Sequence, residues 1–140
     1  MKKLILILIS LFLSFLVHAQ KADELIGKYH MPNKLDIEIF KIGSKYYGKV
    51  IALNGWENGK TTDYKNPDEE KRNEPLVGKI ILSDLEYDNE DKIWANGTLY
   101  GPEKGISVDF KVTEMRKNEI EVVASKYFIR KTLIWKKIKS

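Results

Sequence analysis

The chain has 140 residues, with 24 basic and 20 acidic side chains, a net charge of +4 and no cysteine. This length predicts a single domain, and the lack of cysteine excludes disulfides and thiol nucleophiles. Because the excess of positive charge is small and no basic stripe concentrates it, a nucleic-acid-binding protein is not expected.

The first segment is typical of an export signal. Two lysines precede an apolar stretch over residues 4–17, and small side chains follow at positions 17 and 19. A membrane-spanning helix needs about 20 apolar residues, so this shorter stretch favours a signal peptide over residues 1–19. We expect cleavage before Gln20, which would release residues 20–140 as a periplasmic or secreted domain. An uncleaved anchor is the alternative.

The rest of the chain is patterned as strands. Residues 35–39 (LDIEI) and 106–112 (ISVDFKV) alternate apolar and polar side chains with the period of two that half-buried strands show. Eight strands are predicted in all, at residues 25–30, 35–39, 45–53, 76–82, 92–100, 106–112, 119–124 and 132–138. Short strands separated by turn residues predict an all-β fold, a single eight-stranded antiparallel barrel. At that strand number the interior is either filled by side chains or holds one small ligand.

One polar stretch, DYKNPDEEKRNEPLVG at residues 63–78, interrupts the strand pattern. Asn66 can cap a helix that begins with Pro67, and Pro75 prevents the helix from continuing. We therefore expect a short helical insertion around residues 66–73, ordered rather than floppy, which could act as a lid.

Asp63 and Arg72 in this stretch have two interpretations. Asp63 could cap the chain or pair with Arg72, and so hold the insertion against the barrel. Alternatively, Arg72 could present its guanidinium to a ligand carboxylate or phosphate at the barrel opening. The structural role is favoured, because helix capping already explains Asn66.

Two spaced motifs point to a family. Residues 63–78 contain Asp–x–x–Asn–Pro leading through an arginine to Pro–Leu–x–Gly, and residues 94–105 read Trp–x–x–Gly–x–x–Tyr–x–Pro–x–x–Gly. The chain thereby resembles an exported bacterial family, domain of unknown function 2147. The resemblance covers essentially the mature chain. It implies a lipocalin-like β-barrel in the periplasm or outside the cell, and no established activity. The tryptophan often found near the start of such chains is Tyr29 here, which can still plug a closed barrel end.

Motifs for catalysis and metal binding are largely missing. His30 is the only histidine after the predicted signal peptide, so a zinc site or a histidine-containing triad has one candidate. Residues 83–91 (SDLEYDNED) alternate acidic side chains as a calcium loop does, but Asn89 and Ala95 stand where an EF-hand requires glycine and glutamate. We expect no enzyme activity, no metal and no cofactor.

Aromatic residues on the predicted strands are either ordinary core or the lining of an apolar cavity, with a tyrosine hydroxyl or tryptophan N–H as the polar handle. The candidates for ligand contact are Tyr47, Arg72, Trp94, Tyr100 and Trp135. The residues expected to be structural are Asp63, Asn66, Pro67, Pro75, Gly78, Gly97, Pro102 and Gly105. Small residues within the strands, among them Gly48 and Gly97, could leave room for a ligand.

Two functions remain open from the sequence. The first is a non-enzymatic carrier or sensor that binds one small apolar or amphipathic molecule inside the barrel. The second is a structural or protein-interaction module of the bacterial envelope, with a barrel packed solid. Lys131, Lys136 and Lys137 either solvate the outside of a strand or make a weak contact with an anionic envelope surface.

Overall fold

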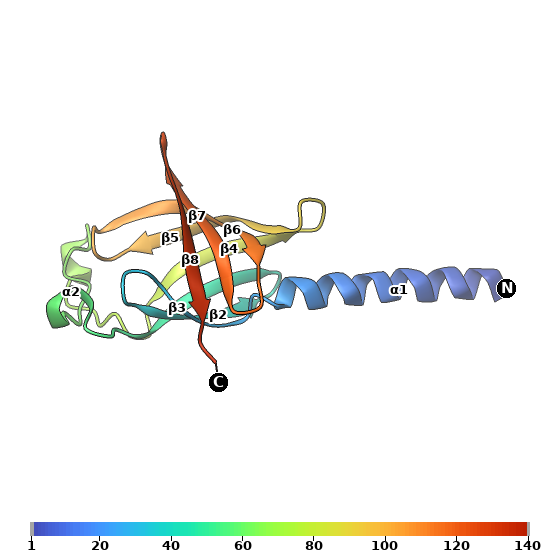
Figure 1. Cartoon of the computed structure of the whole chain (residues 1–140), viewed down its shortest axis with the longest axis horizontal. Helices are drawn as coiled ribbons and strands as arrows, with labels where there is room; N and C mark the ends of the chain where they lie inside the picture. Colours follow the sequence, from blue (N-terminus) through green and yellow to red (C-terminus); the bar gives the residue numbers. More distant parts are fainter. Residues whose placement is uncertain (1, 140) are drawn as a thin grey trace.

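The computed structural model describes residues 2–139, without the side chains of residues 15–20. Eight antiparallel strands close into one barrel in which each strand pairs with the next and β8 returns to β1 (Figure 1). The strands are β1 (Gly27–His30), β2 (Asp36–Ile42), β3 (Lys45–Ala52), β4 (Ile80–Asp88), β5 (Ile93–Gly101), β6 (Ile106–Met115), β7 (Glu119–Lys126) and β8 (Ile129–Lys137). The predicted all-β, eight-stranded antiparallel barrel is confirmed.

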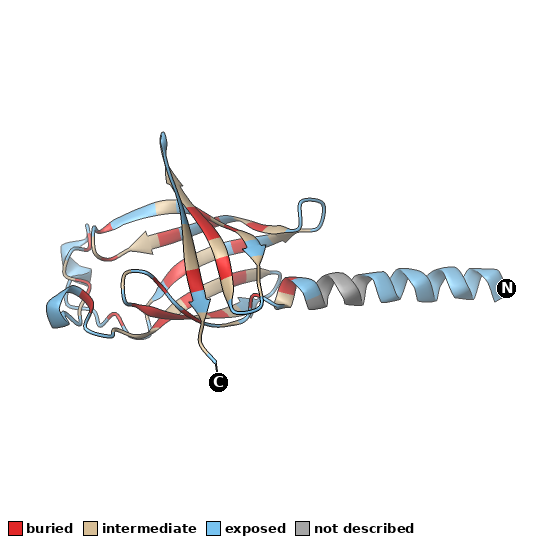
Figure 2. Cartoon of the chain, in the orientation of Figure 1, coloured by how far each residue is buried: buried red, intermediate tan, exposed pale blue. Residues whose placement is uncertain are grey.

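Three helical segments accompany the strands: α1 (Lys2–Asp23), α2 (Trp56–Gly59) and the 3₁₀ turn η1 (Glu69–Lys71). The first of them, α1, projects away from the barrel, and its apolar side chains over residues 4–13 are exposed (Figure 2). Within residues 2–139, no helix combines the length and the apolar character needed to cross a membrane. The predicted cleavage site at Gln20 falls where the side chains lie outside the description.

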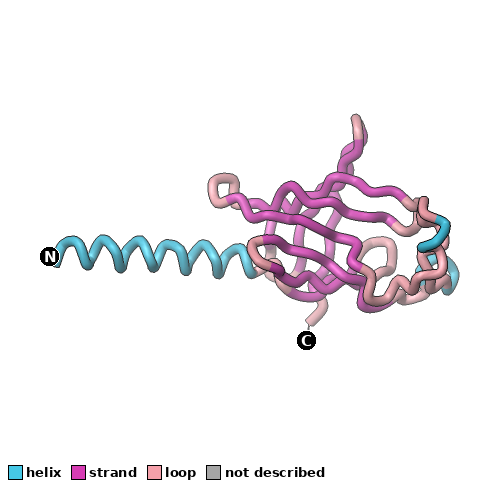
Figure 3. The backbone as a smooth tube through the Cα atoms, turned by 180° about the vertical axis from the view of Figure 1, so that it is seen from behind, coloured by secondary structure: helices cyan, strands magenta, loops and turns pink. Residues whose placement is uncertain are grey.

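The two ends of the barrel differ in their connections. Short turns join β2 to β3, β4 to β5 and β6 to β7 at the end from which α1 projects, here called the α1 end. The other four connections meet at the opposite end, here called the mouth (Figure 3). The longest of these connections, residues 53–79 between β3 and β4, carries α2 and η1 and includes the predicted insertion.

Alternate side chains of the strands fill the barrel. In β3, Tyr46, Gly48 and Val50 are buried and the residues between them are partly exposed. The same alternation places Ile120 and Val122 of β7 in the interior. Fully burying an apolar side chain of this size stabilises a fold by about 1.5–3 kcal/mol. A continuous core of this kind can hold the fold without disulfides.

Gly48 and Gly97 face this core but leave no room in it. A Cβ atom on Gly48 would overlap Ile37 Cδ1, and one on Gly97 would lie 2.8 Å from Leu85 Cδ2. The space beside each glycine is therefore occupied by a neighbouring side chain. The expectation that they would make space for a ligand is wrong at these two positions.

Strand β4 begins later than predicted. The sequence predicts a strand over residues 76–82, whereas β4 starts at Ile80 and continues to Asp88. Gly78 explains the shift, because its φ of 91° lies in the left-handed region, which an extended strand does not use. The acidic stretch that resembled a calcium loop is thus mostly strand, followed by the β4–β5 turn.

The helical part of the insertion is a single 3₁₀ turn, η1. Its cap is Asp68, whose carboxylate accepts a hydrogen bond of 3.1 Å from the backbone N–H of Glu70. Asn66 caps one step earlier, because its side-chain oxygen accepts the N–H of Asp68 at 2.9 Å. The order that the sequence predicts in this segment is therefore built from two successive side-chain turns.

The ladder between β1 and β8 is the shortest in the barrel. Its register pairs are Tyr29 with Lys137 and His30 with Lys136. In contrast, β7 and β8 pair along nearly their whole length. The hairpin that joins β7 to β8 extends away from the rest of the barrel, at the top of the view in Figure 1.

Candidate functional site

A buried cluster of polar side chains ties the insertion to the barrel. The Asp63 carboxylate, fully buried, accepts hydrogen bonds from Asn66 Nδ2 at 2.7 Å and from the Tyr100 hydroxyl at 2.7 Å. Lys79 Nζ lies 3.0 Å from Asp63 Oδ2, the oxygen that also accepts from Asn66. We call Asp63, Asn66, Lys79 and Tyr100 the clasp. It joins the insertion to β5, since Tyr100 lies on that strand.

The electrostatics of the clasp favour a charged pair. Burial alone would raise the pKa of the Asp63 carboxyl, but hydrogen bonds from Asn66, Tyr100 and Lys79 outweigh burial and lower that pKa below its ordinary value of 3.8. Burial opposes the charge of Lys79, yet Glu74 and Asp63 together raise the pKa of this amine. Burial and the bond to Asp63 raise the pKa of the Tyr100 hydroxyl. Asp63 and Lys79 are therefore both ionised at neutral pH.

A close backbone approach fixes the β5–β6 loop against the insertion. Gly105 has φ 66°, and a Cβ atom there would overlap the carbonyl oxygen of Lys65. Lys65 Nζ in turn donates to the carbonyl oxygen of Glu103 at 3.0 Å. Pro102 is buried in the same loop. The two motif segments of the sequence thus lie against one another, because they form the two sides of this contact.

Arg72 does not join the clasp. Its Nε donates to the carbonyl oxygen of Asn66 at 2.8 Å, and its guanidinium lies 3.7 Å from the Glu69 carboxylate. The interpretation that Asp63 pairs with Arg72 is wrong, since Lys79 is the cationic partner. Pro67 and Pro75 are exposed in the insertion, and Pro75 forms a bridge with Thr62.

The mouth contains an apolar cavity of about 560 Å³, which we call the mouth cavity. It lies between the β1–β2 loop, the β5–β6 loop and the β7–β8 hairpin. Its apolar lining includes Met31, Leu99, Ile106, Val108, Leu133 and Trp135. Three lysines, Lys104, Lys126 and Lys131, and one acidic residue, Glu103, also line it. The cavity is therefore lined mainly by apolar side chains, and the charged side chains among its lining are mostly basic.

Trp135 lines the mouth cavity and carries a buried indole N–H. Its side chain is 1% exposed and stacks on Phe110 with ring centroids 5.0 Å apart. Its indole N–H has no hydrogen-bond partner in the described part of the chain. A buried donor without an acceptor costs about 1–3 kcal/mol. A ligand oxygen that accepted this hydrogen bond would recover that cost.

The other four ligand candidates lie elsewhere. Tyr47 is on the outer face of β3, where it stacks on Phe40 and donates to Asp84 at 3.2 Å. Trp94 is in the core, and its N–H donates to the carbonyl oxygen of Ala22 at 3.0 Å. Tyr100 belongs to the clasp and Arg72 to the insertion, as described above. Of the five candidates, all within the described chain, Trp135 is the one that lines the mouth cavity.

Sequence reasoning did not single out the remaining lining residues. Ile106 and Val108 were placed on the apolar face of their strand, but that pattern is shared by every core position. Met31 and Leu99 carried no distinguishing feature. The usable signal is positional: they lie in or beside connections that meet at one end of the barrel.

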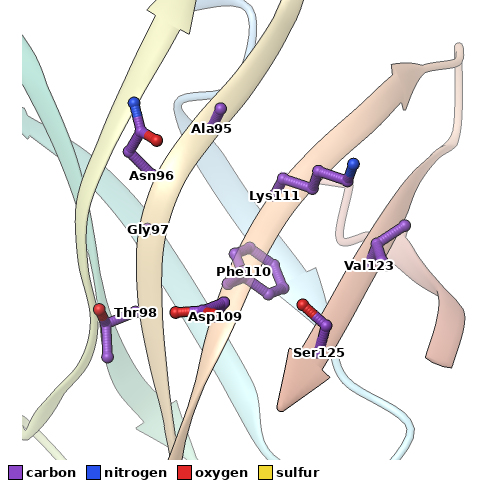
Figure 4. A pocket seen from close by; sticks show the side chains of 9 residues that line it. All are labelled: Ala95, Asn96, Gly97, Thr98, Asp109, Phe110, Lys111, Val123 and Ser125. Atoms are coloured by element: carbon purple, nitrogen blue, oxygen red, sulfur yellow. The ribbon is translucent and has the colours of Figure 1, made fainter. Parts of the chain in front are cut away.

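A second hollow lies along β5, β6 and β7 and has a volume of about 500 Å³ (Figure 4). Register pairs Asp109 with Ser125 and Lys111 with Val123 across it. These positions alternate with the buried Phe110 and Val122, so they belong to the outer face. The described residues hold no group of three or more metal-ligating side chains, there or elsewhere. This hollow lacks a buried unpartnered group, and we regard the mouth cavity as the better candidate.

Comparison with known proteins agrees with the fold. Residues 27–137 match a family described as an uncharacterized protein conserved in bacteria, domain of unknown function 2147. The chain belongs to this family. Its two motif segments form the clasp and the contact between Lys65 and Gly105.

One solved structure is similar to this family member over most of its length. It is protein HP1028 from the human pathogen Helicobacter pylori, described as belonging to the lipocalin family. The identity is 24%, the TM-score is 0.70, and the match covers 82% of this chain and 83% of that one. The likeness supports a lipocalin-like barrel. No curated protein matches the sequence.

Proposed function

We propose that this protein binds one small, largely apolar molecule in the mouth cavity and performs no catalysis. The observation that carries the proposal is the unpartnered N–H of Trp135 beside an apolar chamber of about 560 Å³. Small-molecule sites are chambers of about 300–1,000 Å³ with a few placed polar groups. The lipocalin-like fold supports small-ligand binding in general terms.

The charges of the lining favour an amphipathic ligand with an anionic head. Lys104, Lys126 and Lys131 contribute three positive charges, against one negative charge from Glu103. An apolar body would rest against Leu99, Val108 and Leu133, and an oxygen of the head or body would accept the Trp135 N–H. Such a ligand satisfies both the apolar and the basic part of the lining.

We also propose that the protein is exported and acts as a soluble domain of the envelope. The apolar side chains over residues 4–13 of α1 are exposed and the helix projects away from the barrel (Figure 1). Among the side chains that the structure describes, the first to pack in the core is Ala22, in the cluster that also contains Leu25 and Trp94. Cleavage before Gln20 would therefore leave the barrel contacts in place.

A packed structural module is the second candidate. The filling of Gly48 by Ile37 and of Gly97 by Leu85 favours it, because the middle of the barrel is solid there. The two candidates differ only at the mouth. If the mouth cavity binds nothing, the protein is a scaffold.

The decisive experiment measures whether a ligand stabilises the folded protein, using protein purified from the envelope of the bacterium that produces it. A fatty acid, an isoprenoid alcohol and anilinonaphthalene sulfonate would be titrated while the unfolding temperature and tryptophan fluorescence are recorded. A ligand present at a hundredfold excess over its Kd should stabilise the native state by about 2.7 kcal/mol.

The matched control for this titration is Tyr47→Phe, which alters an aromatic residue on the outer face and should leave binding unchanged. Native mass spectrometry of the same sample would detect a retained ligand. If none of the probes moves either signal and the native mass is that of the bare chain, the binding proposal fails and the scaffold stands.

A further inference from the structure

The tip of the β7–β8 hairpin exposes three large apolar side chains in a row. Tyr127 is 90% exposed, Phe128 104% and Ile129 68%. The hairpin rises away from the body of the barrel, at the top of Figure 1. Isolated exposed apolar residues are common on protein surfaces, but a contiguous group of this kind marks an interaction site.

The turn itself is built against local preference. Lys126 pairs with Ile129, so Tyr127 and Phe128 form a two-residue turn, and Tyr127 has φ 55°. Such turns favour glycine, asparagine or aspartate, because a bulky side chain is strained at positive φ. Both aromatic rings are exposed, so burial in the core does not offset the free-energy cost of this strain. The aromatic tip therefore serves something other than folding.

Basic residues flank the tip. Lys126 precedes it, and Arg130 and Lys131 follow it. Among the described residues, no carboxylate forms an ion pair with any of the three, although Lys126 also donates to the carbonyl oxygen of Ser107 at 3.3 Å. Aromatic side chains above a basic collar match the order of layers in an anionic bilayer, with headgroup charge outside and acyl chains beneath.

We propose that the β7–β8 hairpin docks on an anionic lipid bilayer, with Tyr127, Phe128 and Ile129 in the interfacial layer and Lys126, Arg130 and Lys131 at the headgroups. A stable protein–protein contact buries about 800 Å² on each partner and requires a complementary surface. Three side chains at a narrow convex tip offer much less, whereas a bilayer accepts a convex tip. The proposal does not depend on occupancy of the mouth cavity.

The docked orientation has a direct geometric result. Lys126, Tyr127, Ile129 and Lys131 also line the mouth cavity. Docking through the hairpin would therefore bring the mouth cavity close to the bilayer.

The test is vesicle cosedimentation. It uses the protein in the form that the producing cells release, and intact-mass measurement establishes its N-terminus. Vesicles of phosphatidylglycerol mixed with phosphatidylethanolamine would be compared with phosphatidylcholine alone. Phe128→Ser should weaken partitioning to the anionic vesicles by about tenfold or more, because an apolar ring is lost from the interface. Lys131→Gln should weaken it by about fivefold, the contribution of one basic residue near an anionic surface.

Matched controls sit at the α1 end. Ile42→Ser removes an apolar side chain that is 59% exposed, and Lys117→Gln removes an exposed charge from the β6–β7 turn. Both should bind vesicles as the unchanged protein does. Since all variants carry the same N-terminus, any difference between them reports the hairpin.

A fluorescent variant gives a second, independent readout. The native residues Trp56, Trp94 and Trp135 are all buried, so Phe128→Trp adds one exposed reporter. Its emission should shift to the blue with anionic vesicles and be quenched by brominated lipid. Unchanged emission, equal binding of Phe128→Ser and the parent, or a concentration-dependent dimer that Phe128→Ser abolishes would each overturn the proposal.

Discussion

Trp94 and Trp135 are two buried tryptophans with different polar surroundings. Both are almost fully buried and both pack against an aromatic ring: Trp94 is tilted against Tyr87, and Trp135 stacks on Phe110. The N–H of Trp94 donates to the carbonyl oxygen of Ala22, whereas the N–H of Trp135 has no partner in the described chain. Buried donors are nearly always bonded. The N–H groups of Trp56 and Trp135 are both unpartnered in the described chain, and Trp135 is the one of the two that lines the mouth cavity, where we propose that a ligand binds.

The comparison extends from the two residues to the two ends of the barrel. At the α1 end, the Tyr29 hydroxyl donates to the carbonyl oxygen of Leu25 at 2.8 Å and the Tyr46 hydroxyl donates to Asp23 at 2.6 Å. Tyr29 is buried, and its hydroxyl ties β1 to the segment that precedes it. The tyrosine hydroxyls at the α1 end thus have hydrogen-bond partners within the chain. The mouth combines the hydrogen-bonded clasp with an apolar cavity that the described side chains leave unfilled.

The largest expected effect is at the clasp, and it tests whether the mouth is held as firmly as the α1 end. Asp63→Asn removes one partner of a buried ion pair and should lower the free energy of unfolding by about 3 kcal/mol, measured by urea denaturation. Glu69→Gln, an exposed change in the same insertion, should have no measurable effect. Equal stability of Asp63→Asn and the parent would show that the clasp does not hold the insertion.

The same variant has a pH signature. The pKa of Asp63 is lowered in the folded state, so its stabilisation is fully present above the ordinary value of 3.8 and is lost as the pH falls through the lowered value. The stability difference between the parent and Asp63→Asn should therefore be constant near neutral pH and shrink below pH 3.8. A difference that persists unchanged in acid would rule out the ion pair as its cause.

The next effect tests whether the middle of the barrel is solid. Gly97→Ala places a Cβ atom 2.8 Å from Leu85 and 3.2 Å from the carbonyl oxygen of Phe110. Overpacking of this kind costs about 1–3 kcal/mol, which thermal or urea unfolding would detect. Gly101→Ala is the control on the same strand, because its added atom lies 3.3 Å from the flexible Glu103 side chain and at an ordinary contact distance of 3.6 Å from the carbonyl oxygen of Ile106. Equal stability of the two variants would contradict a packed middle.

A pair of conservative changes sharpens the comparison of the two tryptophans. Trp94→Phe loses a made hydrogen bond and should cost about 1 kcal/mol more stability than Trp135→Phe does. Trp135→Phe should instead weaken ligand binding about fivefold, the equivalent of one hydrogen bond. Titration of the anionic probe into both variants, together with their urea unfolding curves, separates the effects. The reverse pattern would place the ligand at the α1 end.

The smallest effect concerns a surface bond at the α1 end. Tyr46→Phe removes the hydroxyl that, together with Lys41, lowers the pKa of Asp23. The pKa of Asp23 should rise toward its ordinary value of 3.8, with a loss of about 1 kcal/mol in stability. A carboxyl-carbon NMR titration of Asp23 would measure the shift. Lys45→Gln, which lacks a contact with Asp23, is the control.

Much of the fold was readable from the sequence because a strand's side chains alternate with a fixed period. The alternation of Ile106, Val108 and Phe110 with polar residues was enough to predict β6. The start of β4 was not readable, since Leu76 and Val77 are apolar but precede a left-handed Gly78. A backbone angle of this kind leaves no periodic trace.

The clasp and the mouth cavity depend on distances that no local pattern contains. Asp63 and Tyr100 are 37 positions apart, and Lys79 rather than the nearer Arg72 supplies the cation. Trp135 could be named as a candidate only because it is a tryptophan on a strand. Which end of the barrel it reaches follows from the register of closure between β8 and β1, and that register is set by the whole fold.

The short ladder between β1 and β8 sets the order in which the barrel closes. These strands come from opposite ends of the domain, so joining them has a large cost in loop-closure entropy. The pairs Tyr29–Lys137 and His30–Lys136 contribute little free energy to offset that cost. We expect this ladder to form last and to open first in amide hydrogen exchange. Met31 follows β1, and Trp135 on β8 lies with it around the mouth cavity. Transient unzipping there would widen the cavity sideways and give a guest molecule a lateral entrance that never passes the insertion.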